Sequence, residues 1–181
     1  MRNPIIAPLV LLPMAVSSLS VQATEFMTVS QAQTLLFPSA PKFIARDLTL
    51  DDTQRERIKA ATGVRQRNAQ QQVWRAERDG QLLGWFMLDE VIGKHEFISY
   101  AVAISPQGKV IGMEVLSYRE THGGQVREPA WRKNFQGKTL ADPFKLDEDV
   151  PNISGATLSC RNLLDGVKRL LTLHKFYLSN A

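Results

Sequence analysis

The chain has 181 residues, 44% of them hydrophobic, which is enough for one domain with a substantial core. Its 22 Lys and Arg against 18 Asp and Glu give a formal net charge of +4, and these basic residues are spread out rather than massed in a stripe. That pattern argues against nucleic-acid binding. The single cysteine, Cys160, excludes an intramolecular disulfide, a c-type haem and a cysteine-bound iron–sulfur cluster.

The first 24 residues have the order of a secretory signal peptide. Arg2 is their one basic residue, an apolar run extends from Pro4 to about Val16, and small residues lead to Ala23. We predict a signal peptide over residues 1–23, with cleavage after Ala23. The alternative is an uncleaved N-terminal helix that anchors the protein in the membrane.

Two short helices are predicted next. Residues Thr28 to Gln31 are typical of a capping box that opens a helix ending before Pro38. A second helix is predicted from Leu50 to Thr62, capped by Thr49. The stretch Phe37–Arg46 between them is expected to be an irregular connector. We therefore expect a helical segment over residues 24–72, ahead of a domain over residues 73–181.

The domain opens with strand patterns. Val73–Arg78 and Leu82–Asp89 flank the strong turn signal Asp79-Gly80, and Phe97–Ile104 and Val110–Tyr118 flank a second turn at Pro106 to Gly108. A short helix is expected around Ala130–Phe135. Apolar residues at helical spacing, Cys160 among them, predict a final helix from about Ala156 to Lys175. The fold class is therefore α+β, a twisted antiparallel sheet packed by helices in a single domain.

The six residues from Ser154 to Ser159 lie where an irregular segment becomes the final helix. A helix N-terminus favours an anion because its first N–H groups are unpaired and the macrodipole is positive there. Gly155 lets the backbone approach such a group, while Ser154, Thr157 and Ser159 supply hydroxyls. Thr157 is one turn before Cys160, so its side chain should face the sheet. The alternative is an ordinary cap, in which Ser154 accepts from the N–H of Thr157.

Together with the upstream run Glu120-Thr121-His122-Gly123-Gly124, this S-G-A-T-L-S string resembles the FMN-binding domain family. That family includes the covalent flavin subunits of the Rnf and sodium-pumping quinone reductase complexes, as well as small periplasmic flavoproteins. In the family, a flavin transferase uses FAD to install FMN in a phosphoester bond to the threonine of the motif. The resemblance covers roughly residues 90 to 175 and implies that Thr157 is the FMN acceptor, surrounded by Ser154, Gly155, Ala156 and Ser159.

The resemblance also implies further FMN contacts. The loop that follows the fourth strand lines the flavin pocket in the family, which implies that Glu120, Thr121 and Gly123 do so here. His95 is a candidate to bond the flavin or relay a proton, or else an edge histidine bonded to backbone. Lys138 follows an aromatic pair that is similar to a stretch in relatives, and it either offsets negative charge near the flavin or is solvated.

One position departs from the family pattern. Relatives usually have an acidic residue three positions before the Ser or Thr that opens the motif, and this chain has Pro151 there. Asp149, two residues further upstream, is the available substitute. No His or Cys spacing predicts a metal site.

The resemblance implies an exported electron carrier with FMN attached to Thr157. It would serve a periplasmic or membrane-associated redox chain rather than act as a stand-alone catalyst. Its partners would be a flavin transferase for maturation and membrane or periplasmic redox proteins. The alternative is a sensing or interaction module that keeps the fold and binds flavin reversibly or not at all.

Overall fold

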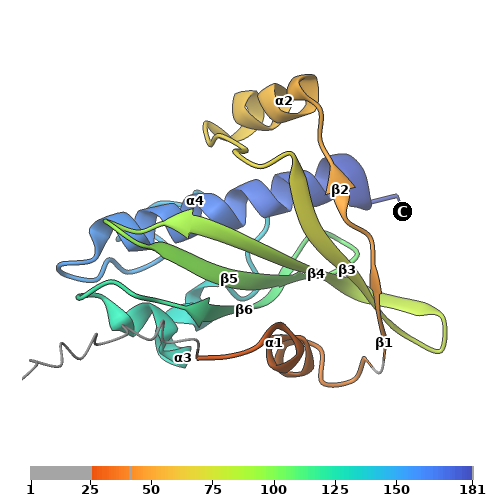
Figure 1. Cartoon of the computed structure of the whole chain (residues 1–181), viewed down its shortest axis with the longest axis horizontal. Helices are drawn as coiled ribbons and strands as arrows, with labels where there is room; N and C mark the ends of the chain where they lie inside the picture. Colours follow the sequence, from red (N-terminus) through yellow and green to blue (C-terminus); the bar gives the residue numbers. More distant parts are fainter. Residues whose placement is uncertain (1–25, 41, 181) are drawn as a thin grey trace, which may run out of the picture.

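The computed structural model describes residues 26–40 and 42–180, so the predicted signal peptide lies outside the described residues. Within these ranges the strands form one six-stranded antiparallel sheet in the order β1-β3-β4-β5-β6, with β2 also paired to β3 (Figure 1). The strands are β1 (Lys42–Ala45), β2 (Leu48–Thr49), β3 (Gln70–Arg78), β4 (Gln81–Ile92), β5 (Phe97–Ile104) and β6 (Val110–Ser117).

The predicted four-strand meander is confirmed as β3 to β6. The connector predicted over Phe37–Arg46 is wrong in part, because it contains β1, whose residues pair with Trp74 to Glu77 of β3. Apolar and polar residues alternate only weakly in Lys42–Ala45, so the local pattern does not indicate a strand. These residues form one because the edge of β3, about 30 residues later in the sequence, offers hydrogen-bond partners. The segment over residues 24–72 therefore contributes strands to the same sheet as the rest of the domain.

The two early helices are α1 (Val29–Leu36) and α2 (Asp52–Thr62). The capping box of α1 is confirmed, with Thr28 and Gln31 as reciprocal partners. The cap of α2 is Asp51 rather than Thr49, because Thr49 belongs to β2. The Asp51 carboxylate accepts from the N–H of Gln54 at 2.7 Å, a stronger bond than a hydroxyl would make there.

The later helices include α3 (Pro129–Arg132), flanked by 3₁₀ turns at Gly124–Arg127 and Lys133–Phe135, which matches the predicted short helix. The final helix, α4 (Thr157–Leu173), continues as a π-helical turn over His174–Leu178. Helix α4 runs along one face of the sheet and α1 lies on the other (Figure 1). Cys160 is fully buried on the apolar stripe of α4, as predicted.

Each face of the sheet therefore has its own hydrophobic core. The larger core joins α4 to inward side chains of β4, β5 and β6, including Trp85, Tyr100 and Leu163. The smaller joins α1 to the opposite face, around Phe86 and Phe37. Because helices cover both faces of the sheet, side chains on both sides of β5 are buried. This explains why its sequence does not alternate cleanly between apolar and polar residues.

A buried polar network lies inside the larger core. The guanidinium of Arg169 on α4 forms an ion pair with Asp89 of β4, and Tyr100 of β5 donates to the same carboxylate at 2.5 Å. Burial raises the pKa of the Tyr100 hydroxyl well above its ordinary value, and the Asp89 charge raises it further. Gly166 fits over this tyrosine because a Cβ there would lie 2.1 Å from the Tyr100 oxygen.

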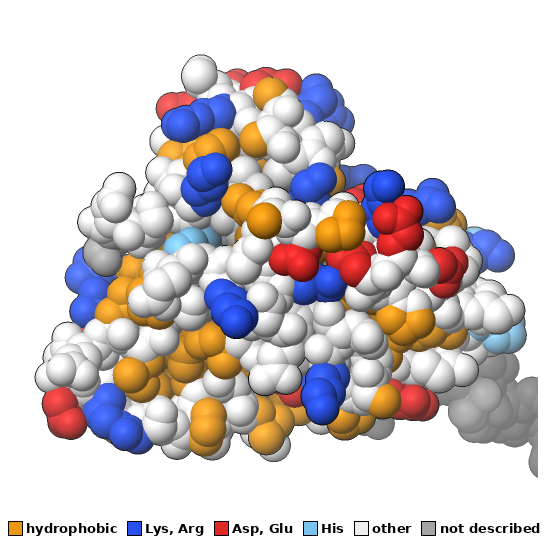
Figure 2. Space-filling view, turned by 180° about the vertical axis from the view of Figure 1, so that it is seen from behind, with side chains coloured by type: hydrophobic (Ala, Val, Ile, Leu, Met, Phe, Trp, Pro, Cys, Tyr) orange, Lys and Arg blue, Asp and Glu red, His pale blue; other side chains and the backbone are white. Residues whose placement is uncertain are grey.

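On the face seen from behind in Figure 2, Lys and Arg side chains are scattered among acidic and apolar ones rather than gathered in a stripe. In the part of the chain that the structure describes, none of the helices combines the length and apolarity needed to cross a bilayer.

Candidate flavin site

The N-terminus of α4 lacks a side-chain cap among the described residues. Its N-cap is Ala156, and Ser154 is exposed instead of accepting from the N–H of Thr157. The ordinary-cap alternative for Ser154 is therefore not observed. Gly155 adopts φ +80°, a left-handed conformation that favours glycine. The first turn of α4 is left with the unpaired N–H groups and positive dipole end that suit a phosphate.

Hydrogen bonds hold the segment that leads into α4. The indole N–H of Trp131 donates to the carbonyl of Pro151 at 2.8 Å, and the N–H of Asn152 donates to the Asp147 carboxylate at 3.0 Å. The N–H of Ala156 then closes a turn onto the carbonyl of Ile153 at 2.9 Å. These contacts fix the direction from which Thr157 enters the helix.

The Glu120–Gly124 loop packs directly on the start of α4. Gly123 has φ +87°, and a Cβ there would lie 2.1 Å from the Ala156 Cβ and 2.6 Å from the Tyr118 hydroxyl oxygen. Tyr118 donates to the His122 carbonyl, and its hydroxyl lies 3.4 Å from the Ser159 oxygen. The glycine and the small Ala156 are thus both required for the loop and helix to touch.

Gly123→Ala should destabilise the protein more than Gly63→Ala. Both glycines have positive φ, so each substitution costs about 1–2 kcal/mol of backbone strain, but nothing lies within 4 Å of a Cβ at Gly63. Overpacking against Ala156 should add about 1–3 kcal/mol at Gly123. Denaturant unfolding of the two variants measures this difference in the free energy of unfolding. Equal losses of stability would show that the loop moves to accommodate the added methyl group.

The β4–β5 turn, residues 93–96, forms the opposite side of the site. One carboxylate oxygen of Glu120, Oε1, accepts from the backbone N–H of His95 at 2.6 Å and of Glu96 at 3.0 Å. Gly93 lies against the same carboxylate, since a Cβ there would be 2.4 Å from Oε1. The turn and the Glu120–Gly124 loop are therefore joined.

A cleft of about 460 Å³ opens between this turn, the loop and the first turn of α4, within the size range of small-molecule sites. We call it the flavin cleft. Its lining residues are Lys94, His95, Glu120, Thr121, His122, Gly155, Ala156, Thr157, Leu158 and Ser159. Residues from three distant parts of the sequence thus meet around the half-buried Thr157.

The cleft brings together most of the predicted cofactor contacts, but not all. Ser154 does not line it, and Gly123 packs behind it on Ala156. Ser159 lines the cleft but is 2% exposed, with its hydroxyl beside Tyr118. Lys138 lies elsewhere, buried in an ion pair with Asp149 at 2.6 Å.

Three residues that line the cleft are not among the predicted contacts: Lys94, His122 and Leu158. His122 sits inside the motif loop, and Lys94 directly precedes His95, so proximity to recognised positions was the available signal for both. Leu158 lies in the first turn of α4 and does not belong to its buried apolar stripe. Its side chain is 46% exposed, which is unusual for a leucine.

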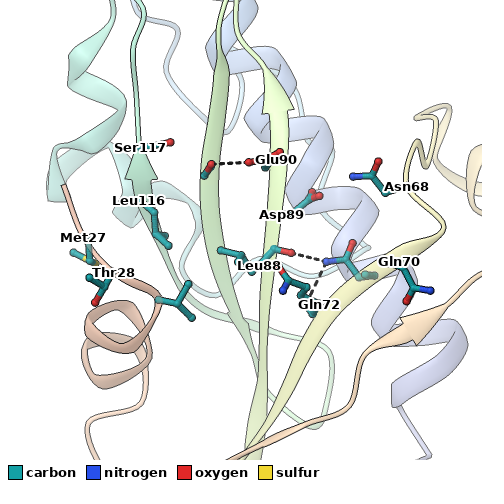
Figure 3. A pocket seen from close by; sticks show the side chains of 13 residues that line it. Met27, Thr28, Asn68, Gln70, Gln72, Leu88, Asp89, Glu90, Leu116 and Ser117 are labelled. Atoms are coloured by element: carbon teal, nitrogen blue, oxygen red, sulfur yellow. Dashed lines mark hydrogen bonds between the residues drawn. The ribbon is translucent and has the colours of Figure 1, made fainter. Parts of the chain in front are cut away.

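A second hollow, of about 430 Å³, lies on the α1 face of the sheet (Figure 3). Met27 and Thr28 border it on one side, while Gln70 and Gln72 of β3 border it on the other. Its floor includes Leu88, which belongs to the α1 core, whereas the start of α4 packs on the opposite core. A group attached to Thr157 would therefore occupy the flavin cleft and not this hollow.

The residues of the flavin cleft suit FMN. The uncapped start of α4 has the free N–H groups that a phosphate can accept from, and Thr157 and Lys94 line the same cleft. In the described part of the chain, no group of His, Cys, Asp or Glu side chains is arranged to hold a metal ion.

Residues 93–172, which contain every side chain of the cleft, match the model of the FMN-binding domain family. These residues form an FMN-binding domain. Its cofactor is FMN. The match begins at the β4–β5 turn and ends near the end of α4, so it includes both the Glu120–Gly124 loop and the S-G-A-T motif.

Two curated relatives are components of ion- or proton-translocating oxidoreductase complexes. The chain is 31% identical over 111 residues to a component of the ion-translocating oxidoreductase complex of Stutzerimonas stutzeri, covering 55% of this chain and 49% of that protein. It is 26% identical over 126 residues to a component of the proton-translocating ferredoxin:NAD(+) oxidoreductase complex of Clostridium ljungdahlii. That alignment covers 65% of this chain and 68% of that protein. The chain thus spans about half the length of the first relative.

The crystal structure of NqrC from Shewanella oneidensis has a similar fold. The TM-score is 0.54 at 20% sequence identity, and the alignment covers 75% of this chain and 80% of that one. The likeness confirms that this antiparallel sheet with its helices is a shared architecture.

Proposed function

We propose that this protein is an electron-carrying flavoprotein whose FMN is attached covalently, through its phosphate, to Thr157. The observation that carries the proposal is the position of the Thr157 hydroxyl, at an uncapped helix N-terminus that opens into the flavin cleft. A phosphoester there would place the phosphate on unpaired backbone N–H groups.

The attachment step balances with FAD as donor. The Thr157 hydroxyl oxygen forms a bond to the phosphorus on the FMN side of the pyrophosphate, the pyrophosphate bond breaks, AMP leaves and the hydroxyl proton is lost. A flavin transferase would catalyse this step, because no hydrogen bond among the described residues joins the Thr157 hydroxyl to a base that could take its proton.

Bound FMN supplies the redox chemistry, and the chain supplies position and electrostatics. The α4 N-terminus would hold the phosphate, and the Glu120–Gly124 loop and the β4–β5 turn would enclose the ring. Lys94 at the rim would favour negative charge on the ring when it is reduced. A tether also suits an exported protein, which could not readily replace a lost cofactor.

We further propose that the protein is exported by a cleaved signal peptide and works in the periplasm, with the uncleaved N-terminal anchor as the alternative. Its redox partners would be membrane or periplasmic proteins, consistent with relatives that belong to ion-translocating complexes. Leu158 at the cleft and Phe97 directly after the β4–β5 turn remain 46% and 55% exposed, and both are available for such contacts.

Unfolding tests the tether directly. Protein produced with an active flavin transferase should be yellow, and after denaturation and gel filtration the flavin absorbance should elute with the chain. Flavin that elutes at low molecular mass would show reversible binding, and colourless protein would show that this chain is not flavinylated.

A second candidate function is a sensing or interaction module that does not carry electrons. The observation in its favour is Pro151 at the usual acidic position, together with the engagement of Asp149, whose carboxylate accepts from Lys138, Phe144 and Lys145. Asp149 is therefore occupied within its own loop. Colourless protein in the experiment above would favour this candidate.

A further inference from the structure

We propose that Glu120 is a positioning residue, whose carboxylate holds the β4–β5 turn in place as a wall of the flavin cleft. This inference rests on the proposed function for its purpose, but its geometry is independent of the flavin. The family resemblance implied a direct FMN contact for Glu120, whereas the structure shows its Oε1 engaged with the turn.

The contact spans 25 residues of sequence. Glu120 follows β6, and its Oε1 receives two backbone N–H groups from the turn between β4 and β5, those of His95 and Glu96. The turn itself is closed by the N–H of Gly93 donating to the Glu96 carbonyl at 2.7 Å. Gly93 also leaves room for the carboxylate, since a side chain there would collide with it.

The carboxylate is held in its charged form. Partial burial raises the pKa of Glu120, but N–H donors from Glu96, His95 and Lys94 lower it by more, so the net shift is downward. Because the folded pKa is depressed, the stabilisation is present above the ordinary pKa of a glutamate. It is lost as the pH falls through the lowered value.

The turn carries two of the side chains that line the cleft, Lys94 and His95, and both are exposed. Their position relative to Thr157 follows from the backbone of the turn. A bond between an anion and two amides is stronger than a neutral pair, so Glu120 fixes this wall against the loop that packs on α4. Its loss should let the turn move away and open the cleft.

Two substitutions separate a clamp from a direct anionic contact with the flavin. In Glu120→Gln the side-chain amide oxygen can still accept from the two N–H groups, although it has no charge. Glu120→Ala removes the acceptor. A clamp predicts that Gln restores what Ala loses, whereas an anionic contact predicts that both variants fail alike.

The primary measurement is amide hydrogen exchange in protein made without a flavin transferase, so it does not depend on attachment. In Glu120→Ala, exchange at His95 and Glu96 should accelerate at least about tenfold relative to wild type, while Tyr100 in the middle of β5 is unchanged. Glu120→Gln should recover most of the protection. A matched control is Glu90→Ala, which removes a carboxylate that accepts from Ser99 on the same strand pair.

The second measurement uses flavinylated protein. Acrylamide, a neutral quencher, should reach the flavin more readily in Glu120→Ala than in wild type, and Glu120→Gln should restore the shielding. Wild-type exchange rates in Glu120→Ala, or equal behaviour of Gln and Ala in exchange, would overturn the proposal. Absence of flavin from the wild type would instead refute the proposed function and leave the exchange result to decide on Glu120.

Discussion

Thr157→Val is expected to abolish covalent flavin attachment completely. Valine keeps the β-branched shape of threonine and removes only the hydroxyl, so the start of α4 and the cleft should keep their form. Thr157→Ser keeps a hydroxyl at the same position and should still accept FMN, at a reduced yield. Flavin absorbance that elutes with the unfolded chain measures the outcome in each variant.

Matched serine variants control this prediction. Ser154→Ala should keep full attachment, because Ser154 is exposed and does not line the cleft. Ser159→Ala should also keep the flavin, since the Ser159 hydroxyl is buried beside Tyr118. Covalent flavin in Thr157→Val would mean that another residue is the acceptor.

Arg169→Met should destabilise the fold by about 3–5 kcal/mol. The side chains of Arg169 and Asp89 are 6% and 7% exposed, so removing the guanidinium leaves an unpaired carboxylate inside the core. The Arg169 guanidinium also donates to the Arg65 carbonyl at 3.2 Å, which ties α4 to the segment after α2. The free energy of unfolding from denaturant titration is the quantity to measure.

The double variant Asp89→Leu with Arg169→Met distinguishes the charge from the packing. If the loss arises from an uncompensated buried charge, the double variant should be more stable than Arg169→Met alone, because the orphaned carboxylate is gone. Additive losses would show instead that the two side chains act independently, as packing elements.

Local signals in the sequence predicted much of the fold. The capping box at Thr28 and the Asp79-Gly80 turn each depend on a few adjacent residues, and the apolar stripe around Cys160 depends on helical period alone. Strand β1 and the cap at Asp51 were missed for the complementary reason. Both depend on the pairing of Lys42–Ala45 and Thr49 with β3. That pairing joins distant parts of the sequence, so a local pattern does not reveal it.

The candidate site shows the same division. The S-G-A-T motif and the loop after β6 could be recognised in the sequence, and the structure brings both to one cleft. The partners of individual charges could not be predicted. Lys138 pairs with Asp149, and Glu120 binds backbone amides of the β4–β5 turn, because tertiary contacts decide which donor each carboxylate meets.

Peptide mapping by mass spectrometry, on protein produced with an active flavin transferase, locates the attached flavin on the chain. The peptide containing Thr157 should be heavier by FMN less one water, with fragmentation that places the addition on Thr157. A Thr157 peptide at its unmodified mass, or a flavin located on Ser154 or Ser159, would contradict this expectation.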